Sequence, residues 1–308
     1  MKKRRIAGMI TGGVALSLAL FGGLLLADRL GGTADEAGAT GAPVAASLRP
    51  VNMVSVTETT DLTGAVLRLS GQAEPGATVM LTDRGERVKQ VAVGDEGEWT
   101  ASLPVPDAPM AVEATLFAGE TDGAQVSIRG VETVFRIHRA SDREAGAPAL
   151  IMVSAPAAPS RIVSSPFGGL PGAGPLYLAA IDYDDAGGVI FSGLSEVQGR
   201  VRLYVSGRAI GDTRVGPDGR WALIDASIMP LGEYEVRAEL QPTDAGGERV
   251  SVSVPFERLP PLGVDVGDDG ALQVEFKPFR WQVRRSLLGG GVQSTVIFRP
   301  EPELREAE

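Results

Sequence analysis

One stretch of thirty residues opens with Ser70-Gly71-Gln72-Ala73-Glu74-Pro75-Gly76-Ala77-Thr78-Val79 and ends with Gly94-Asp95-Glu96-Gly97-Glu98-Trp99. It returns 122 residues later, without a gap, as residues 192–221. Ten of the thirty aligned positions are identical, where typical composition would give about two by chance. In the first copy the identical residues are Ser70, Gly71, Glu74, Val79, Leu81, Gly85, Val93, Gly94, Gly97 and Trp99. A repeat of this length predicts two copies of one structural unit.

Short runs of alternating apolar and polar residues surround both copies. They span 51–57, 66–73, 78–82, 87–93, 99–105, 112–118 and 126–138, and then 177–183, 189–194, 201–205, 221–224, 234–240 and 250–256. Turn sequences such as Glu74-Pro75-Gly76 separate the runs. About seven short strands at this spacing are typical of an immunoglobulin-like sandwich. The expected fold class is therefore mainly β, with two such sandwiches in series at residues 51–139 and 176–259.

Composition narrows the class of protein. Hydrophobic residues make up 44% of the 308 residues, which is enough for real cores. The 40 glycines and 21 prolines indicate many turns, as short-stranded β folds require. A net charge of −10 argues against binding nucleic acid, whose phosphates need a basic face. The chain has no cysteine, which removes disulfides, thiolate metal sites and cysteine nucleophiles.

The N-terminus, residues 1–27, has the pattern of a transmembrane anchor. Four basic residues at positions 2–5 precede an apolar run of 22 residues at positions 6–27. A helix of that length spans a bilayer core of about 30 Å. The basic residues favour the cytoplasm, which predicts a single pass through the inner membrane with the bulk of the chain in the periplasm. A cleaved signal peptide is the alternative.

Two segments are predicted to be linkers. Residues 28–50 are rich in alanine, glycine and threonine, which predicts a flexible linker. Residues 140–175 contain six prolines and are expected to be a stiffer one. Within the second, the apolar pieces at 150–153 and 162–163 are long enough to add an edge strand.

The repeated stretch, with Gly216-Pro217-Asp218-Gly219-Arg220-Trp221 in its second copy, resembles the bacterial Ig-like repeats of envelope and surface proteins. In that group the modules often precede a C-terminal LysM domain, a small glycan-binding βααβ unit. The tail, residues 260–308, resembles such a domain at 281–288, at a Gly289-Gly290-Gly291 break and at 292–299. The resemblance implies a short α/β LysM-like segment with helices near 281–288 and 295–298.

The LysM resemblance also implies a binding site. Its candidate glycan-binding residues are Lys277, Pro278, Phe279, Arg280 and Trp281, with Trp281 on the family's tryptophan position. Pro300-Glu301 stands where the family has Ala-Asn, and the family's last strand has no counterpart before the final residue. The segment is therefore expected to be a truncated or degenerate LysM.

Residues that could carry chemistry are few. His138 is the sole histidine, and alternation places it with Arg136 on an outward strand face. Asp182, Asp184 and Asp185 cluster at a strand end, where a turn is favoured over a calcium site. No catalytic set, metal site or cofactor is expected, so the chain is predicted not to be an enzyme.

The function expected is that of a membrane-tethered periplasmic protein that associates with peptidoglycan through its tail, with the Ig-like modules as a spacer. The basic stretch at 276–300 suits an anionic cell-wall partner. One alternative is an adaptor that binds an envelope protein and carries a vestigial tail. Another is an accessory of a cell-wall hydrolase. The expected partners are peptidoglycan, an envelope protein and, through the N-terminal helix, the inner membrane.

Overall fold

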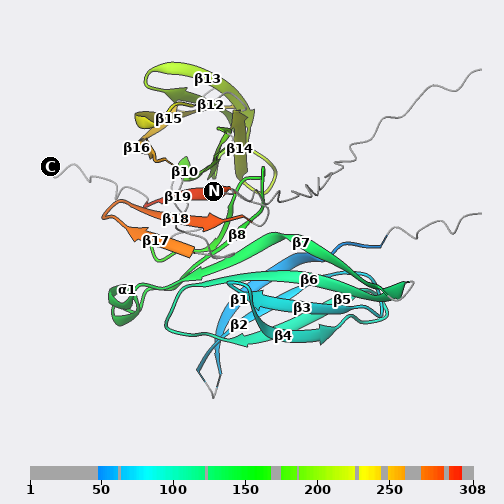
Figure 1. The fold of residues 1–308 in the computed structure, drawn as a ribbon. Coiled ribbons are helices and arrows are strands. Elements are labelled where there is room, and N and C mark those ends of the chain that lie inside the picture. Colours follow the sequence, from blue (N-terminus) through cyan, green and yellow to red (C-terminus); the bar gives the residue numbers. More distant parts are fainter. Residues whose placement is uncertain are drawn as a thin grey trace, which may run out of the picture. The chain divides into compact units, whose positions relative to one another are not determined.

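The protein is almost entirely β in the part of the chain that the structure, a computed structural model, describes (Figure 1). That part comprises residues 48–61, 64–121, 124–167, 175–185, 187–225, 229–243, 249–260, 272–287 and 291–299. Within it, one short helix, α1 (Ala140–Glu144), accompanies the strands. The mainly β prediction is confirmed.

Seven strands form the first half of the molecule. They are β1 (Asn52–Asp61), β2 (Gly64–Gln72), β3 (Thr78–Asp83), β4 (Glu86–Ala92), β5 (Glu98–Pro104), β6 (Met110–Thr121) and β7 (Ala124–Ile137). One sheet has the order β1-β2-β5, and the other contains the run β4-β3-β6-β7. Burial alternates along β5, where Trp99, Ala101 and Leu103 point inward. Buried residues from both sheets join in one hydrophobic core, because each sheet is apolar on the face turned to the other.

The second half repeats this arrangement. Its strands are β10 (Tyr177–Asp184), β11 (Val189–Leu194), β12 (Gly199–Val205), β13 (Arg208–Arg214), β14 (Arg220–Asp225), β15 (Gly232–Pro242) and β16 (Val250–Arg258). The runs β14-β11-β10 and β13-β12-β15-β16 match the two runs of the first half strand for strand. A second hydrophobic core lies between them. The sequence repeat is thus a repeat of strand order.

The identical residues of the repeat have a packing reason. Gly71 pairs with Trp99 across β2 and β5, and Gly193 pairs with Trp221 across β11 and β14. A Cβ added to Gly71 would lie 2.8 Å from the Trp99 ring, and one added to Gly193 would lie 2.4 Å from the Trp221 ring; each would also meet a backbone carbonyl oxygen of the neighbouring strand at 1.9–2.0 Å. Each indole therefore covers a glycine, and any side chain there would push the ring out of the core.

The tail forms strands instead of the predicted helices. Residues expected to be helical at 281–288 and 295–298 lie in β18 (Arg280–Ser286) and β19 (Val292–Phe298), with β17 (Leu272–Phe276) before them. β19 pairs with β10, so the second-half sheet has the order β14-β11-β10-β19-β18-β17. The helix prediction is wrong, and the described residues of the tail show no LysM-like α/β unit. β-branched residues dominate β19 and favour a strand with both faces covered.

The proline-rich segment 140–175 also adds strands. β8 (Leu150–Ser154) pairs with β7, and β9 (Arg161–Ser164) pairs with β8, as the apolar pieces of this segment allowed. They extend the first-half sheet to six strands in the order β4-β3-β6-β7-β8-β9.

A third hydrophobic core joins the two halves. It combines Phe135, Leu150 and Ile162 of β7, β8 and β9 with Trp281 and Ile297 of β18 and β19. Figure 1 shows the orange and red tail strands near the green strands β7 and β8. Residues 47–308 accordingly form one compact unit.

The predicted anchor, residues 1–27, and most of the predicted flexible linker, residues 28–50, lie outside the described residues. Within the described ranges, no helix is long and apolar enough to cross a membrane.

Candidate functional site

Four of the five residues expected to bind glycan line one groove. Lys277, Pro278, Phe279 and Arg280 form the turn between β17 and β18, which is closed by a hydrogen bond from the Lys277 amide to the Arg280 carbonyl (2.9 Å). The groove lies between this turn and the strands β15 and β16, and its volume is about 620 Å³. On the opposite side it is lined by Ser206, Glu233, Tyr234, Glu235, Pro255, Phe256 and Glu257.

The fifth residue, Trp281, is not part of that surface. Its side chain is 1% exposed and belongs to the core between the two halves. The rings of Phe276 and Phe167 form T-shaped contacts with it at centroid distances of 4.7 and 5.1 Å. Trp281 therefore stabilises the tail and offers no ring face to a ligand, whereas Phe279 is 71% exposed.

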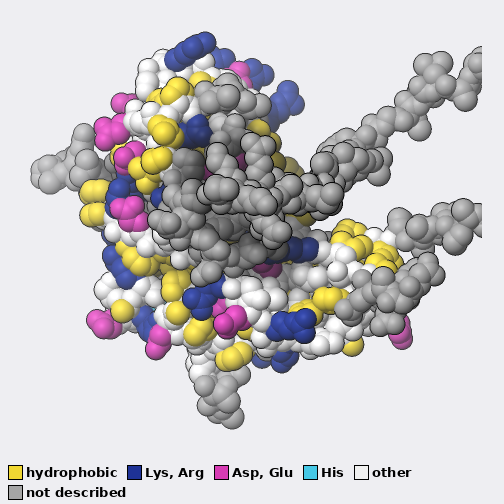
Figure 2. All heavy atoms as spheres, in the orientation of Figure 1, with side chains coloured by type: hydrophobic (Ala, Val, Ile, Leu, Met, Phe, Trp, Pro, Cys, Tyr) yellow, Lys and Arg dark blue, Asp and Glu magenta, His cyan; other side chains and the backbone are white. Residues whose placement is uncertain are grey.

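The basic side chains of the turn already have partners. Arg280 forms an ion pair with Glu257 (3.2 Å), and Lys277 forms one with Glu275 (3.3 Å). The side chains of Glu233 and Glu235 form no such pair with any described residue. The groove thus combines an exposed aromatic ring with free carboxylates. The space-filling view in Figure 2 shows basic and acidic side chains interspersed over one face of the molecule.

A buried polar layer crosses the core between the two halves. Arg285 donates to the Gln293 side-chain oxygen (2.6 and 3.0 Å), donates to Thr133, and lies 3.6 Å from Glu113. Gln293 in turn donates to Ser154 (3.2 Å). Burial lowers the pKa of Arg285 to about 10, and the nearby Glu113 opposes that shift. These bonds fix the tail strands β18 and β19 to β6, β7 and β8 of the first-half sheet.

Asp182 is the second buried group of this layer. Its carboxylate accepts hydrogen bonds from the Ser160 amide (2.8 Å), the Ser160 hydroxyl (2.6 Å) and the Thr295 hydroxyl (2.6 Å). Burial raises the pKa of Asp182, while these bonds and the Arg285 charge oppose the rise. Asp182 thus links the segment before β9 to β10 and β19.

The other two aspartates of the predicted cluster have separate backbone partners. Asp184 accepts from the Gly187 amide (3.1 Å), and Asp185 accepts from the Val292 amide (2.7 Å). Within the described ranges, no group of three histidine, aspartate or glutamate residues could hold a metal ion.

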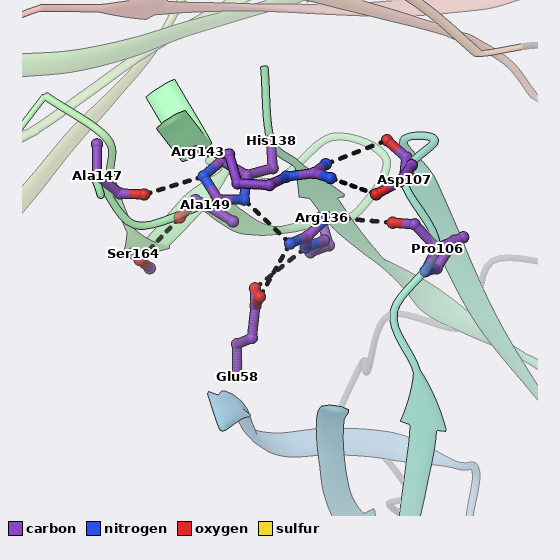
Figure 3. A network of polar contacts seen from close by, with 9 residues as sticks. All are labelled: Glu58, Pro106, Asp107, Arg136, His138, Arg143, Ala147, Ala149 and Ser164. Atoms are coloured by element: carbon purple, nitrogen blue, oxygen red, sulfur yellow. Dashed lines mark hydrogen bonds and ion pairs between the residues drawn. The ribbon is translucent and has the colours of Figure 1, made fainter. Parts of the chain in front are cut away.

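His138 and Arg136 brace the end of β7, as Figure 3 shows. Arg136 donates to Glu58 of β1 (2.9 Å), and the Nε2 atom of His138 lies 2.9 Å from the Ala147 carbonyl oxygen. Arg136 is 2% exposed, so the expectation that it lies on an outward surface is wrong. The face of β7 that carries Arg136 and Val134 is turned toward the β1-β2-β5 sheet rather than toward solvent.

Comparison with known proteins finds similarity to solved structures but no family. No protein-family model matches the chain, and no curated protein matches it. Among solved structures it is similar to the central fibronectin-III array of RIM-binding protein, with 11% identity and a TM-score of 0.24. That similarity covers 77% of this chain and 80% of the other.

Proposed function

We propose that this protein is a non-enzymatic, membrane-tethered component of the cell envelope that associates with peptidoglycan through the groove at the β17–β18 turn. In this proposal residues 51–139 and 176–259 are two Ig-like sandwiches, and the tail is part of their common body rather than a LysM domain. The basic, apolar N-terminus supports the tether, with the folded part in the periplasm.

The observation that carries the proposal is the composition of the groove. Phe279 presents an aromatic ring to solvent beside Tyr234, and Glu233 and Glu235 border the same space. Aromatic faces bury the C–H faces of sugar rings, while carboxylates accept hydrogen bonds from hydroxyl groups. A volume of about 620 Å³ is within the usual range of ligand pockets.

The test is co-sedimentation of residues 47–308 with purified peptidoglycan sacculi. Wild-type protein should pellet with sacculi, and Phe279→Ala should lower the bound fraction severalfold. Val131→Ala is the matched control, because Val131 is another exposed apolar side chain (69%) far from the groove in sequence. Deleting the tail is no substitute, since its strands form part of the core. If wild-type protein stays in the supernatant at low salt, the peptidoglycan proposal is rejected.

The second candidate is an envelope adaptor that binds another protein. The tail strands β18 and β19 are mostly buried and packed into the core shared by both halves. A tail with this structural role need not bind glycan itself, which favours the adaptor. Without sacculus binding, crosslinking of the intact protein in cells would be the measurement for this candidate. A specific crosslinked envelope protein would support the adaptor, and none would reject it.

A further inference from the structure

A second cavity lies where the first-half sheet meets the second-half sheet. Its volume is about 490 Å³. Its lining includes Arg161, Arg214, Arg220, Ile162, Leu194 and Trp221, which come from β9, β13, β14 and β11. These residues are far apart in the chain, and the pairing of β8 with β9 and the shared core bring them together.

The charge of this cavity is opposite to that of the chain. Three arginines line it, although the whole sequence carries a net charge of −10. Arg220 lies 3.7 Å from Asp218 and also donates to the Ile162 carbonyl (3.4 Å). The side chains of Arg161 and Arg214 form no ion pair with any described residue. The arginines therefore leave positive charge that an anion could neutralise.

The acidic residues near the cavity do not balance the arginines. Glu132 is the acidic residue of the lining, and its carboxylate accepts a hydrogen bond from the Met53 amide (2.7 Å). With Asp218 beside Arg220, two carboxylates stand against three guanidinium groups. Burial lowers the pKa of Arg220; the Asp218 carboxylate opposes that shift, and the neighbouring charge of Arg161 adds to it. Like charges held close together are relieved when an anion binds between them.

Apart from Glu132, three serines and two glycines, the rest of the wall is apolar. Leu194, Ala158 and Pro159 leave apolar surface open to the cavity, whereas the side chains of Ile162 and Trp221 are each only 3% exposed. A hydrated inorganic ion gains little from such a wall, whereas an apolar chain or ring gains burial. Guanidinium groups bind carboxylates through two parallel hydrogen bonds, which favours a carboxylate as the charged end.

We propose that this cavity, named here the arginine pocket, binds a small amphiphilic carboxylate, with its charged end at Arg161, Arg214 and Arg220 and its apolar body against Leu194, Ala158 and Pro159. The proposal is independent of the groove at the β17–β18 turn, and either can fail without the other.

The probes are sodium hexanoate, 1-hexanol and inorganic phosphate, titrated into residues 47–308. Trp221 lines the pocket, so its fluorescence reports occupancy, and calorimetry gives the dissociation constant. Hexanoate should bind saturably. Hexanol, which lacks the charge, and phosphate, which lacks the apolar body, should each bind about tenfold more weakly or not at all.

Single substitutions test which arginines bind the carboxylate. Arg161→Gln and Arg214→Gln should each weaken hexanoate binding about tenfold, because each removes a charge-assisted hydrogen bond. Arg208→Gln is the matched control, since Arg208 is an exposed arginine outside the pocket, and it should bind hexanoate as the wild type does. Arg214 is exposed as well, so its variant is expected to fold. Equal affinity for hexanoate and hexanol, or unchanged binding in both pocket variants, would overturn the proposal.

Discussion

Gly193 lies opposite Trp221 in the pairing of β11 with β14, and the same pair occurs at Gly71 and Trp99. The indole, together with a backbone carbonyl oxygen of the neighbouring strand, occupies the space where a side chain would begin. Both tryptophans are nearly fully buried, so neither ring can move toward solvent without opening a core. The glycines and tryptophans of the repeat therefore form matched pairs, because the buried indole can pack only where the opposite residue has no side chain.

Gly193→Ala should destabilise residues 47–308 by about 1–3 kcal/mol, the usual cost of overpacking a dense core. Gly188→Ala is the control, because its added Cβ would meet nothing closer than the Asp225 carbonyl at 3.9 Å. Urea denaturation followed by circular dichroism measures both. Equal stability of the two variants would contradict the pairing argument.

The buried carboxyl group of Asp182 should make the stability of the protein depend on pH. Burial raises its pKa in the folded state, so the folded protein holds this proton more tightly than the unfolded chain does. The contribution of Asp182 to stability is therefore complete below the unfolded value of about 3.9 and declines as the pH rises through the folded pKa.

Asp182→Asn removes this titrating group, so the difference in stability between the wild type and the variant reports the contribution of Asp182. The stability of the wild type relative to this variant should be greatest near pH 4 and should fall toward pH 7. Urea denaturation at several pH values gives the difference, and Asp218→Asn, which alters an exposed carboxylate, is the control. A wild-type advantage that grows with pH would show that hydrogen bonding outweighs desolvation at this carboxyl group.

At the scale of elements, the tail strands form part of the sheet that they join. β19 is buried along its whole length, with Val296 and Phe298 in the second core and Ile297 in the third. β18 and β17 continue the same sheet beyond it. A strand with both faces covered has no single polar face, so its sequence shows no alternation.

Trp281→Ala tests the structural role of β18. Removing this buried indole should lower the free energy of unfolding by about 3–5 kcal/mol, whereas Trp281→Phe should cost less because it keeps an aromatic ring between Phe276 and Phe167. Thermal and urea denaturation measure the loss. A Trp281→Ala protein as stable as the wild type would mean that the tail is dispensable for the core.

For the whole molecule, the third core decides how the two halves unfold. Two sandwiches on a plain linker would unfold independently, since few contacts would cross between them. Here the tail and the segment at 140–175 supply apolar residues and a polar layer to a common interface. We therefore expect the halves to unfold together.

Trp99→Ala should reveal this coupling. The remaining tryptophans, Trp221 and Trp281, report on the second half and on the interface. Their fluorescence midpoint in urea should shift together with the circular dichroism midpoint, although the altered residue lies in the first half. Trp99→Phe is the milder control. A fluorescence midpoint that stays at the wild-type value would show that the halves unfold separately.

Local pattern was sufficient to predict the repeated strands. Period-two alternation, clearest along β5, and turn glycines at fixed offsets place most strands of both halves near their observed positions. The physical reason is that successive side chains of a strand point to opposite faces, so a strand between core and solvent alternates apolar and polar residues. The same alternation made the mainly β class predictable from the sequence.

The strands of the tail, the burial of the arginines and the walls of the groove were evident only from the tertiary structure. Arg136 has the pattern of a surface residue, yet Glu58, 78 positions earlier, pairs with it inside the fold. The LysM resemblance named residues 277–280 as candidates, but the groove that they line is completed by Glu233 and Tyr234, from a strand more than forty positions earlier in the sequence. Contacts of this kind arise from packing between distant segments, and no local period or motif encodes them.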